Sequence, residues 1–135
     1  MAAYSGTPLP QKLGIEPGLS VVTIHAPTNY CRLLRTIPQG VTFSDRLKPE
    51  SSFVHVFIKR RSELEKKLSI LREKMADTGT VWVSWPKRSS GVSTDVTEDV
   101  VRAVALPLGF VDVKVCAIDE TWSGLKLMVR RENRK

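Results

Sequence analysis

Two short apolar segments separated by an amphipathic helix constrain the fold more than any other feature of the sequence. Residues 53–58 and 80–85 are rich in β-branched and aromatic side chains, which is typical of buried strands. The stretch between them repeats at the spacing of one helical face, with Leu64, Leu68, Leu71 and Met75. A strand, a helix and a strand in this order predict a parallel pair joined by a right-handed crossover.

Short polar residues indicate where the helices begin. Ser62 and Glu65 have the spacing of a capping box for the helix after residue 58. Asn29 is placed to cap a short helix over residues 30–35, and Thr94 to cap a later helix whose buried face carries valines.

Four more strands complete the prediction, over residues 20–26, 41–44, 111–118 and 124–130. The five residues 119–123 are short enough for an antiparallel hairpin between the last two. We therefore predict one α/β domain over residues 1–135, a three-layer Rossmann-like fold with a mostly parallel six-stranded sheet and a C-terminal antiparallel hairpin. Numbered along the chain, the strands are expected in the order 2-1-3-4-6-5, with the sixth antiparallel.

The charge of the chain is basic but dispersed. The formal net charge is +7, and the one directional cluster is the tail, residues 130–135, which we expect to be frayed. No helix carries a basic stripe, and no alternation of aromatic and basic residues resembles a platform for single strands. Nucleic acid is therefore not the expected partner.

Composition excludes several other classes. No apolar run approaches the roughly 20 residues that span a bilayer, and residues 1–10 lack the apolar stretch of a signal peptide, so we expect a cytoplasmic protein without membrane contact. Cys31 and Cys116 stand in apolar surroundings without a CxxC pair, which predicts two buried free thiols and no metal site.

The order of elements resembles a class I methyltransferase fold with some middle elements missing. Residues 13–18, Leu-Gly-Ile-Glu-Pro-Gly, resemble the entry to the first strand in that superfamily. The next loop departs from it, because methyltransferases carry glycines there to admit the cofactor and this chain has His25-Ala26-Pro27-Thr28-Asn29-Tyr30. We therefore expect no S-adenosylmethionine and no other cofactor.

Longer phrases resemble an uncharacterised bacterial family known as domain of unknown function 3052. They are residues 4–9 (YSGTPL), 83–87 (VSWPK), 94–99 (TDVTED) and 113–123 (VKVCAIDETWS). The resemblance implies a bacterial origin and carries no activity or site residues with it.

A ligand site is expected beyond the carboxyl ends of the strands, where the strand order reverses. Cations and helix starts converge at that edge and would suit an anion, whereas the opposite edge is made of turns and is expected to bring few charges. Trp85 either covers the sheet edge or walls a pocket for a planar group. The candidate ligand residues are Asn29, Lys59, Arg60, Arg61, Trp85, Lys87, Arg88, Ser89 and Ser90.

Catalytic motifs are missing from the sequence. It has no P-loop and no nucleophile elbow, His25 has no evident partner, and His55 is expected to be a buried, hydrogen-bonded histidine. We expect a non-catalytic domain that binds an anionic small molecule or a protein. The alternatives are an atypical S-adenosylmethionine-dependent methyltransferase and a nucleic-acid-binding protein.

Overall fold

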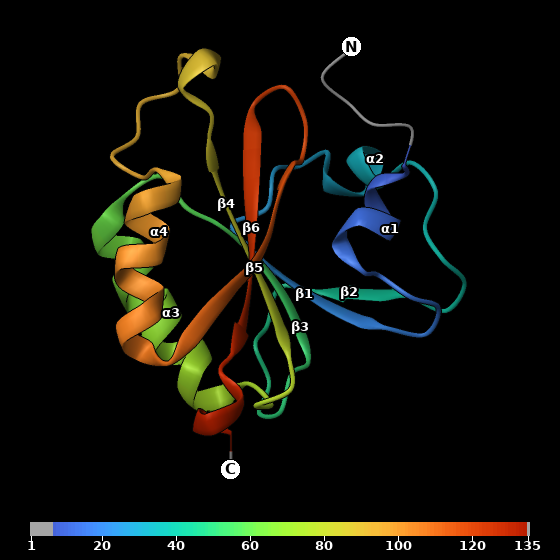
Figure 1. The fold of residues 1–135 in the computed structure, drawn as a ribbon. Coiled ribbons are helices and arrows are strands. Elements are labelled where there is room, and N and C mark those ends of the chain that lie inside the picture. The colour runs from blue at the N-terminus through green and yellow to red at the C-terminus, as the bar shows by residue number, and fades with distance from the viewer. Residues whose placement is uncertain (1–6, 135) are drawn as a thin grey trace.

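Six strands form one twisted sheet in the computed structural model, which describes residues 7–134 (Figure 1). They are β1 (Ser20–Ile24), β2 (Thr42–Ser44), β3 (Phe53–Phe57), β4 (Thr80–Pro86), β5 (Phe110–Ala117) and β6 (Trp122–Val129). Their order is β2-β1-β3-β4-β6-β5. The pairs from β2 to β4 are parallel, and β6 is antiparallel to both of its neighbours. The predicted fold class and strand order are confirmed.

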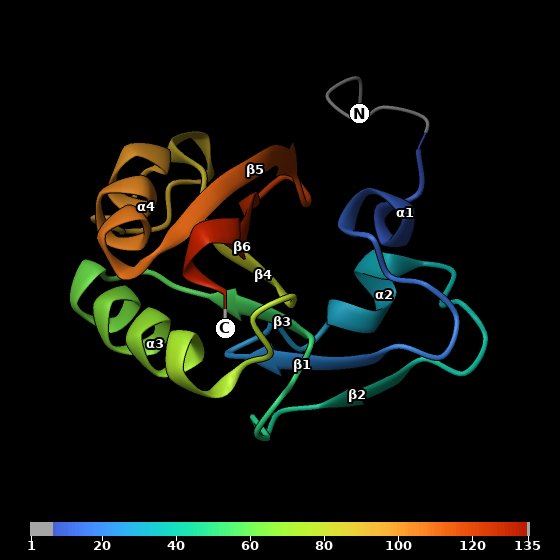
Figure 2. The ribbon, with the colours of Figure 1, turned by 60° about the horizontal axis from the view of Figure 1, so that its bottom comes forward.

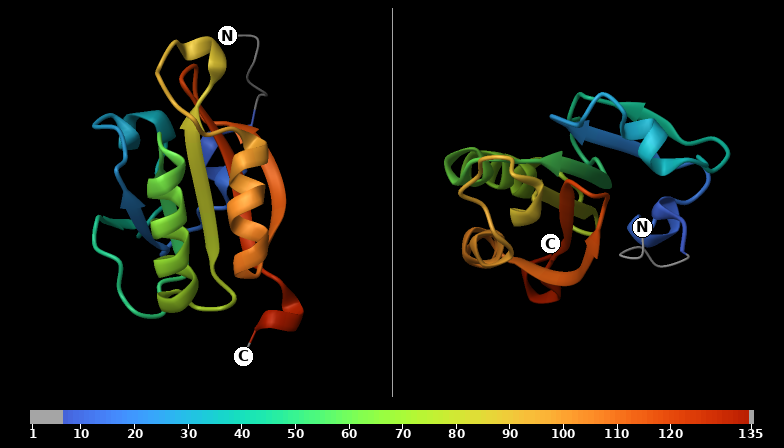
Figure 3. Two further views of the ribbon diagram at one scale, coloured as in Figure 1. Left: turned by 90° about the vertical axis from the view of Figure 1, so that its left-hand side faces the viewer. Right: turned by 90° about the horizontal axis from the view of Figure 1, so that it is seen from above.

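Helices cover both faces of this sheet (Figure 2). They are α1 (Leu9–Leu13), α2 (Tyr30–Leu34), α3 (Arg61–Lys74) and α4 (Glu98–Ala105), with 3₁₀ turns η1 (Arg88–Ser90), η2 (Leu106–Leu108) and η3 (Arg131–Asn133). α3 and α4 lie side by side over one face, and α1 and α2 lie over the other (Figures 2 and 3). The three layers enclose two apolar clusters, one on each side of the sheet.

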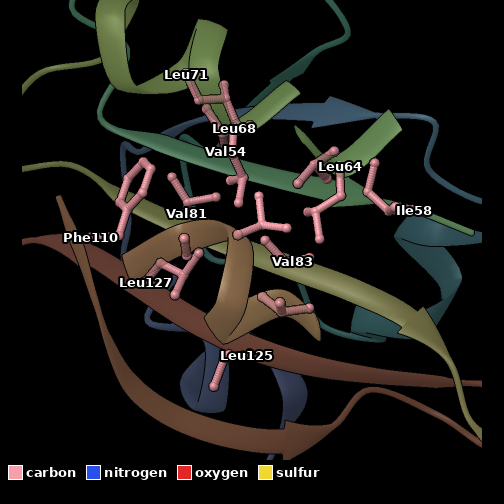
Figure 4. Close-up of a cluster of buried hydrophobic side chains, with 14 of the residues drawn as sticks. Val54, Ile58, Leu64, Leu68, Leu71, Val81, Val83, Phe110, Leu125 and Leu127 are labelled. Atoms are coloured by element: carbon pink, nitrogen blue, oxygen red, sulfur yellow. The ribbon is translucent and has the colours of Figure 1, made fainter. Parts of the chain in front are cut away.

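The larger cluster lies under α3 and α4 (Figure 4). The predicted stripe of α3 points into it, with Leu64 and Leu68 fully buried and Leu71 only 1% exposed. Valines of β3 and β4 meet this stripe from the sheet because alternate side chains of a strand share one face. At roughly 1.5–3 kcal/mol for each fully buried large apolar side chain, these contacts supply much of the driving force for folding.

Three polar side chains, linked by hydrogen bonds, lie beside the smaller cluster, under α2. His55 is fully buried, its Nδ1 lies 2.9 Å from the Tyr30 hydroxyl, and its Nε2 lies 2.7 Å from Ser84 Oγ. The imidazole also stacks on Phe57, with ring centroids 4.3 Å apart. Burial lowers the pKa of His55 to about 3, so the ring is neutral at pH 7. The expectation of a buried, hydrogen-bonded histidine is confirmed.

The predicted capping box at the start of α3 is wrong. With Ser62 as the cap the helix would begin at Glu63, but α3 begins two residues earlier, at Arg61, so Ser62 lies inside its first turn and makes no cap. The carboxylate of Asp95 instead accepts a hydrogen bond from the backbone N–H of Arg61 at 2.7 Å. Glu65 does not reach back to the backbone, because its carboxylate lies 3.3 Å from the Arg61 guanidinium.

The other two predicted caps also differ from the structure. Asn29 precedes α2 without a side-chain cap. α4 starts at Glu98, later than predicted, and Thr97 Oγ1 accepts from the N–H of Val100. Thr94 holds the preceding loop by donating to the carbonyl of Lys59 and accepting from Val96 N–H. Its hydroxyl can serve a turn as readily as a helix, which is why the sequence misplaced this helix start.

The cysteines and the C-terminal tail differ from what the sequence suggests. Cys31 is exposed and Cys116 is only partly buried, so the prediction of two buried thiols is wrong. Of the predicted frayed tail, residues 130–135, the structure describes all but Lys135: Arg130 N–H and the Asn133 amide both donate to Gly109 O, and Arg134 Nε donates to Val129 O. Within residues 7–134, no helix is long and apolar enough to cross a membrane.

Candidate functional site

The strand order places the candidate site at the carboxyl edge of the sheet. β1 lies between β2 and β3, and the chain crosses to β2 over one face through α2 and from β3 to β4 over the other through α3. The order therefore reverses beside β1, where open α/β sheets bind their ligands. The loops after β1, β3 and β4 border this region, as the sequence predicted.

Four basic side chains follow β3 and β4 at this edge. The two strands are paired as far as Phe57 and Ser84, and Ile58 N–H donates to Ser84 O at 2.8 Å, after which β4 continues to Pro86. Over residues 7–134 the structure pairs none of the four with a carboxylate; they are Lys59, Arg60, Lys87 and Arg88. Lys87 is partly exposed and the other three are exposed. Four unpaired cations along one edge of the sheet produce a positive potential that an anion would relieve.

Arg61 and the start of α3 are already engaged. Asp95 caps the Arg61 N–H, and Glu65 pairs with the Arg61 side chain. A carboxylate at a helix N-terminus satisfies the same N–H groups that an exogenous anion would use. An anion at this edge would therefore be bound by basic side chains rather than by the backbone N–H groups at the start of α3.

The loop after β4 is organised by its own hydrogen bonds. Ser90 Oγ donates to Lys87 O at 2.6 Å and accepts from Val92 N–H at 3.1 Å, which closes the turn η1. Lys87 N–H donates to Thr121 O at 2.7 Å and ties the loop to the β5–β6 hairpin. The Ser90 hydroxyl thus stabilises the loop, while the Ser89 side chain is exposed.

Two predicted ligand residues, Trp85 in β4 and Asn29 before α2, lie outside the loops after β3 and β4. The Trp85 ring is only 6% exposed and packs in the cluster under α3 and α4, which leaves little surface to wall a pocket. Asn29 is exposed at the start of α2, on the other face of the sheet (Figure 3). The structure joins the β3 and β4 loops through Lys59 O, which accepts from Thr94 Oγ1, whereas Asn29 belongs to the loop after β1.

The sequence analysis missed a contact between His25 and Glu63 at the same edge. His25 Nδ1 lies 3.2 Å from the Glu63 carboxylate, and His25 has a left-handed φ of 58° that side chains other than glycine rarely adopt. Both groups remain accessible, with side chains 52% and 35% exposed. The available signal was topological, because the residue after β1 and the first turn of the helix after β3 must share this edge.

Two surface hollows lie away from the cations. One of about 620 Å³ opens at the opposite edge, where α3 ends, and contains Glu50, Arg72, Glu73 and Asp77. The expectation that this edge brings few charges is therefore wrong, although the surplus of carboxylates makes the hollow unsuited to anions. The second, of about 190 Å³, lies between α3 and the ends of β1 and β2. Within the described residues no group of histidine, cysteine and acidic side chains is arranged to hold a metal ion.

The fold is similar to those of several solved structures at very low sequence identity. A proposed type 11 methyltransferase from Sulfolobus solfataricus matches with a TM-score of 0.63 and 13% identity, over 94% of this chain and 92% of that one. A protein of the NADB-Rossmann superfamily from Streptococcus agalactiae matches at 0.58 and 9%, over 98% and 72%. The fibrillarin pre-rRNA processing protein of Methanococcus jannaschii matches at 0.52 and 10%, over 93% and 70%.

No protein-family model and no curated protein matches the sequence. At such low identity the structural likeness establishes the fold alone, a methyltransferase-like Rossmann-like domain. Function has to be argued from the site.

Proposed function

We propose that the protein is a non-catalytic domain that binds a small anionic molecule through the loops after β3 and β4. The observation that carries the proposal is the set of unpaired cations at the ends of two adjacent, rigidly paired strands. Rigid strands hold the start of each loop in place, so little ordering is needed on binding. Arg88 and Arg60 offer planar donor pairs that suit phosphate or carboxylate oxygens.

The alternative, an atypical S-adenosylmethionine-dependent methyltransferase, is favoured by the fold of the neighbouring structures. The loop after β1 argues against it, because His25, Ala26 and Pro27 stand where that superfamily has glycines. His25 also has a left-handed φ of 58°, and its Nδ1 lies 3.2 Å from the Glu63 carboxylate.

A thermal-shift comparison separates these functions. Pyrophosphate should raise Tm in a dose-dependent way, while S-adenosylmethionine and S-adenosylhomocysteine should not. A Tm increase with the sulfonium compounds at micromolar concentration would instead support the methyltransferase. Binding to random-sequence DNA that weakens steeply with salt would support the nucleic-acid function. If none of the probes acts, the binding function proposed here is wrong.

We also propose the family of the protein and its cellular location. Membership in domain of unknown function 3052 is supported by the matching phrases, of which residues 83–87 and 113–123 contribute to β4, β5 and their loops. A cytoplasmic location is supported by the two unpaired thiols, Cys31 and Cys116.

A further inference from the structure

We propose a second ligand site on the outer side of α3, which takes a small carboxylic acid with one ring or an equivalent apolar body. The site is the hollow of about 190 Å³ between α3 and the ends of β1 and β2. It is distinct from the basic loops after β3 and β4, and neither of the two proposed sites depends on the other.

The floor of this hollow is apolar and incompletely covered. Ile24 at the end of β1, Leu47 in the β2–β3 loop and Ile70 on α3 line it. Ile70 is 44% exposed, although it faces other apolar side chains across the hollow. An apolar body placed here would remove this surface from water and gain about 25 cal/mol for each Å² that it covers.

The rim of the hollow carries an excess of positive charge. Lys67 and Lys74 both line it, and over the described residues neither is paired with a carboxylate. They flank Ile70 on the same face of α3, three residues before it and four after, so an ammonium group stands on each side of the exposed side chain. Asp45 is the one acidic residue that lines the hollow. Two ammonium groups and one carboxylate leave a charge of +1, which matches a monoanion.

The volume limits the size of the ligand. An apolar cavity of about 150 Å³ accommodates benzene. A hollow of about 190 Å³ therefore has room for one ring and a short carboxylate arm, and is too small for a nucleotide or a dinucleotide.

The His25–Glu63 contact lies beside residues that line the hollow. His25 directly follows Ile24, and Glu63 lies one helical turn before Lys67 on α3. His25 has a left-handed φ of 58° at the point where the chain leaves β1 after Ile24. A backbone of this kind persists only where its surroundings impose it, and such positions concentrate at functional sites.

The test is a titration of the ¹⁵N-labelled protein followed by NMR, with phenylacetate as the probe. Acetate supplies the charge without the ring, and benzyl alcohol supplies the ring without the charge. We expect phenylacetate to shift signals of residues around Ile24, Leu47 and Ile70, and to bind at least tenfold more tightly than either fragment.

Variants on the surface of α3 assign the contacts. Lys67→Ala and Lys74→Ala should each weaken phenylacetate about five- to tenfold, and Ile70→Asp should abolish binding. Lys66→Ala is the matched control, because Lys66 is exposed on the same helix but does not line the hollow. All four positions are at the surface or its margin, so the variants should fold, and dispersed NMR spectra will verify this. The proposal is overturned if phenylacetate causes no localised shifts at 10 mM, if acetate binds equally well, or if Lys66→Ala weakens binding as much as Lys67→Ala.

Discussion

Asp95 and Arg61, 34 residues apart in the sequence, are joined by a 2.7 Å hydrogen bond from the Arg61 N–H to the Asp95 carboxylate. This bond fastens the loop before α4 to the first turn of α3, on the side of the sheet that holds the larger core. It also places a negative charge on the helix N-terminus. Among the described residues at this edge of the sheet, Lys59, Arg60, Lys87 and Arg88 in the flanking loops remain unpaired.

Removing this carboxylate should destabilise the protein. Asp95→Ala leaves a helix N–H without its partner and should lower the free energy of unfolding by about 1 kcal/mol, whereas Asp95→Asn should retain most of the stability. Urea unfolding measures both. Asp99→Ala is the control, because its side chain is 97% exposed and its one ion pair is long, at 3.6 Å. Equal losses for Asp95→Ala and Asp99→Ala would show that Asp95 makes no effective cap.

The buried hydrogen bonds of His55 predict a second stability effect. Ser84→Ala removes the partner of Nε2 and leaves a polar nitrogen unpaired in the core, which should cost about 1–3 kcal/mol. Tyr30→Phe should act similarly through Nδ1. Ser93→Ala, at an exposed loop position, should change stability by less than about 0.5 kcal/mol. If Ser84→Ala proves as mild as Ser93→Ala, the chain of hydrogen bonds contributes nothing to stability.

Stability should also depend on pH through His55. Its pKa is lowered by burial to about 3 in the folded protein, whereas an unfolded histidine titrates near 6.5. Between these values the unfolded chain binds more protons, so stability falls as the pH decreases. From pH 7 to pH 5 the parent should lose about 2 kcal/mol more than His55→Gln, in which this titration is absent. Parallel pH profiles of the two proteins in urea unfolding would contradict the assignment.

Gly124 on β6 marks a close approach between the sheet and the hairpin loop. A Cβ at this position would lie 2.9 Å from Ile118 Cδ1 and 3.2 Å from Trp82. Gly124→Ala should therefore cost about 1–3 kcal/mol through overpacking. Adding Ile118→Val removes the clashing methyl group, so the double variant should be more stable than the sum of the single changes predicts. Strict additivity in thermal unfolding would mean that the clash is relieved elsewhere.

The architecture was largely readable from the sequence because its signals are local. The apolar stripe of α3 predicts a helix, and the β-branched segments predict strands. Short connections between these elements then allow few orders of the strands in the sheet. The capping errors have the opposite origin. Ser62 and Thr94 satisfy local capping patterns, but Asp95 arrives from a distant loop and the Thr94 hydroxyl is used to bind Lys59 O.

The candidate site was predicted only in outline. The ends of the predicted strands are enough to place four cations at this edge: Lys59, Arg60, Lys87 and Arg88. The burial of Trp85, in contrast, depends on which face of the sheet its side chain takes. The partners of Arg61 and His25 come from other elements, so their engagement required the three-dimensional structure. The hollow beside α3 likewise involves side chains from β1, the β2–β3 loop and α3, and no single segment indicates it.

The most direct test of the proposed function is calorimetric titration of pyrophosphate into the parent protein, Lys87→Ala and Arg131→Ala. Arg131 is an exposed cation in η3, at the end of the molecule opposite η1 (Figure 1). A partly desolvated charge-assisted contact contributes about 1.5–3 kcal/mol, so Lys87→Ala should weaken pyrophosphate binding about tenfold or more. Arg131→Ala should bind as the parent does. If Lys87→Ala retains the parent affinity, or if Arg131→Ala loses as much, the loops after β3 and β4 are not the anion site.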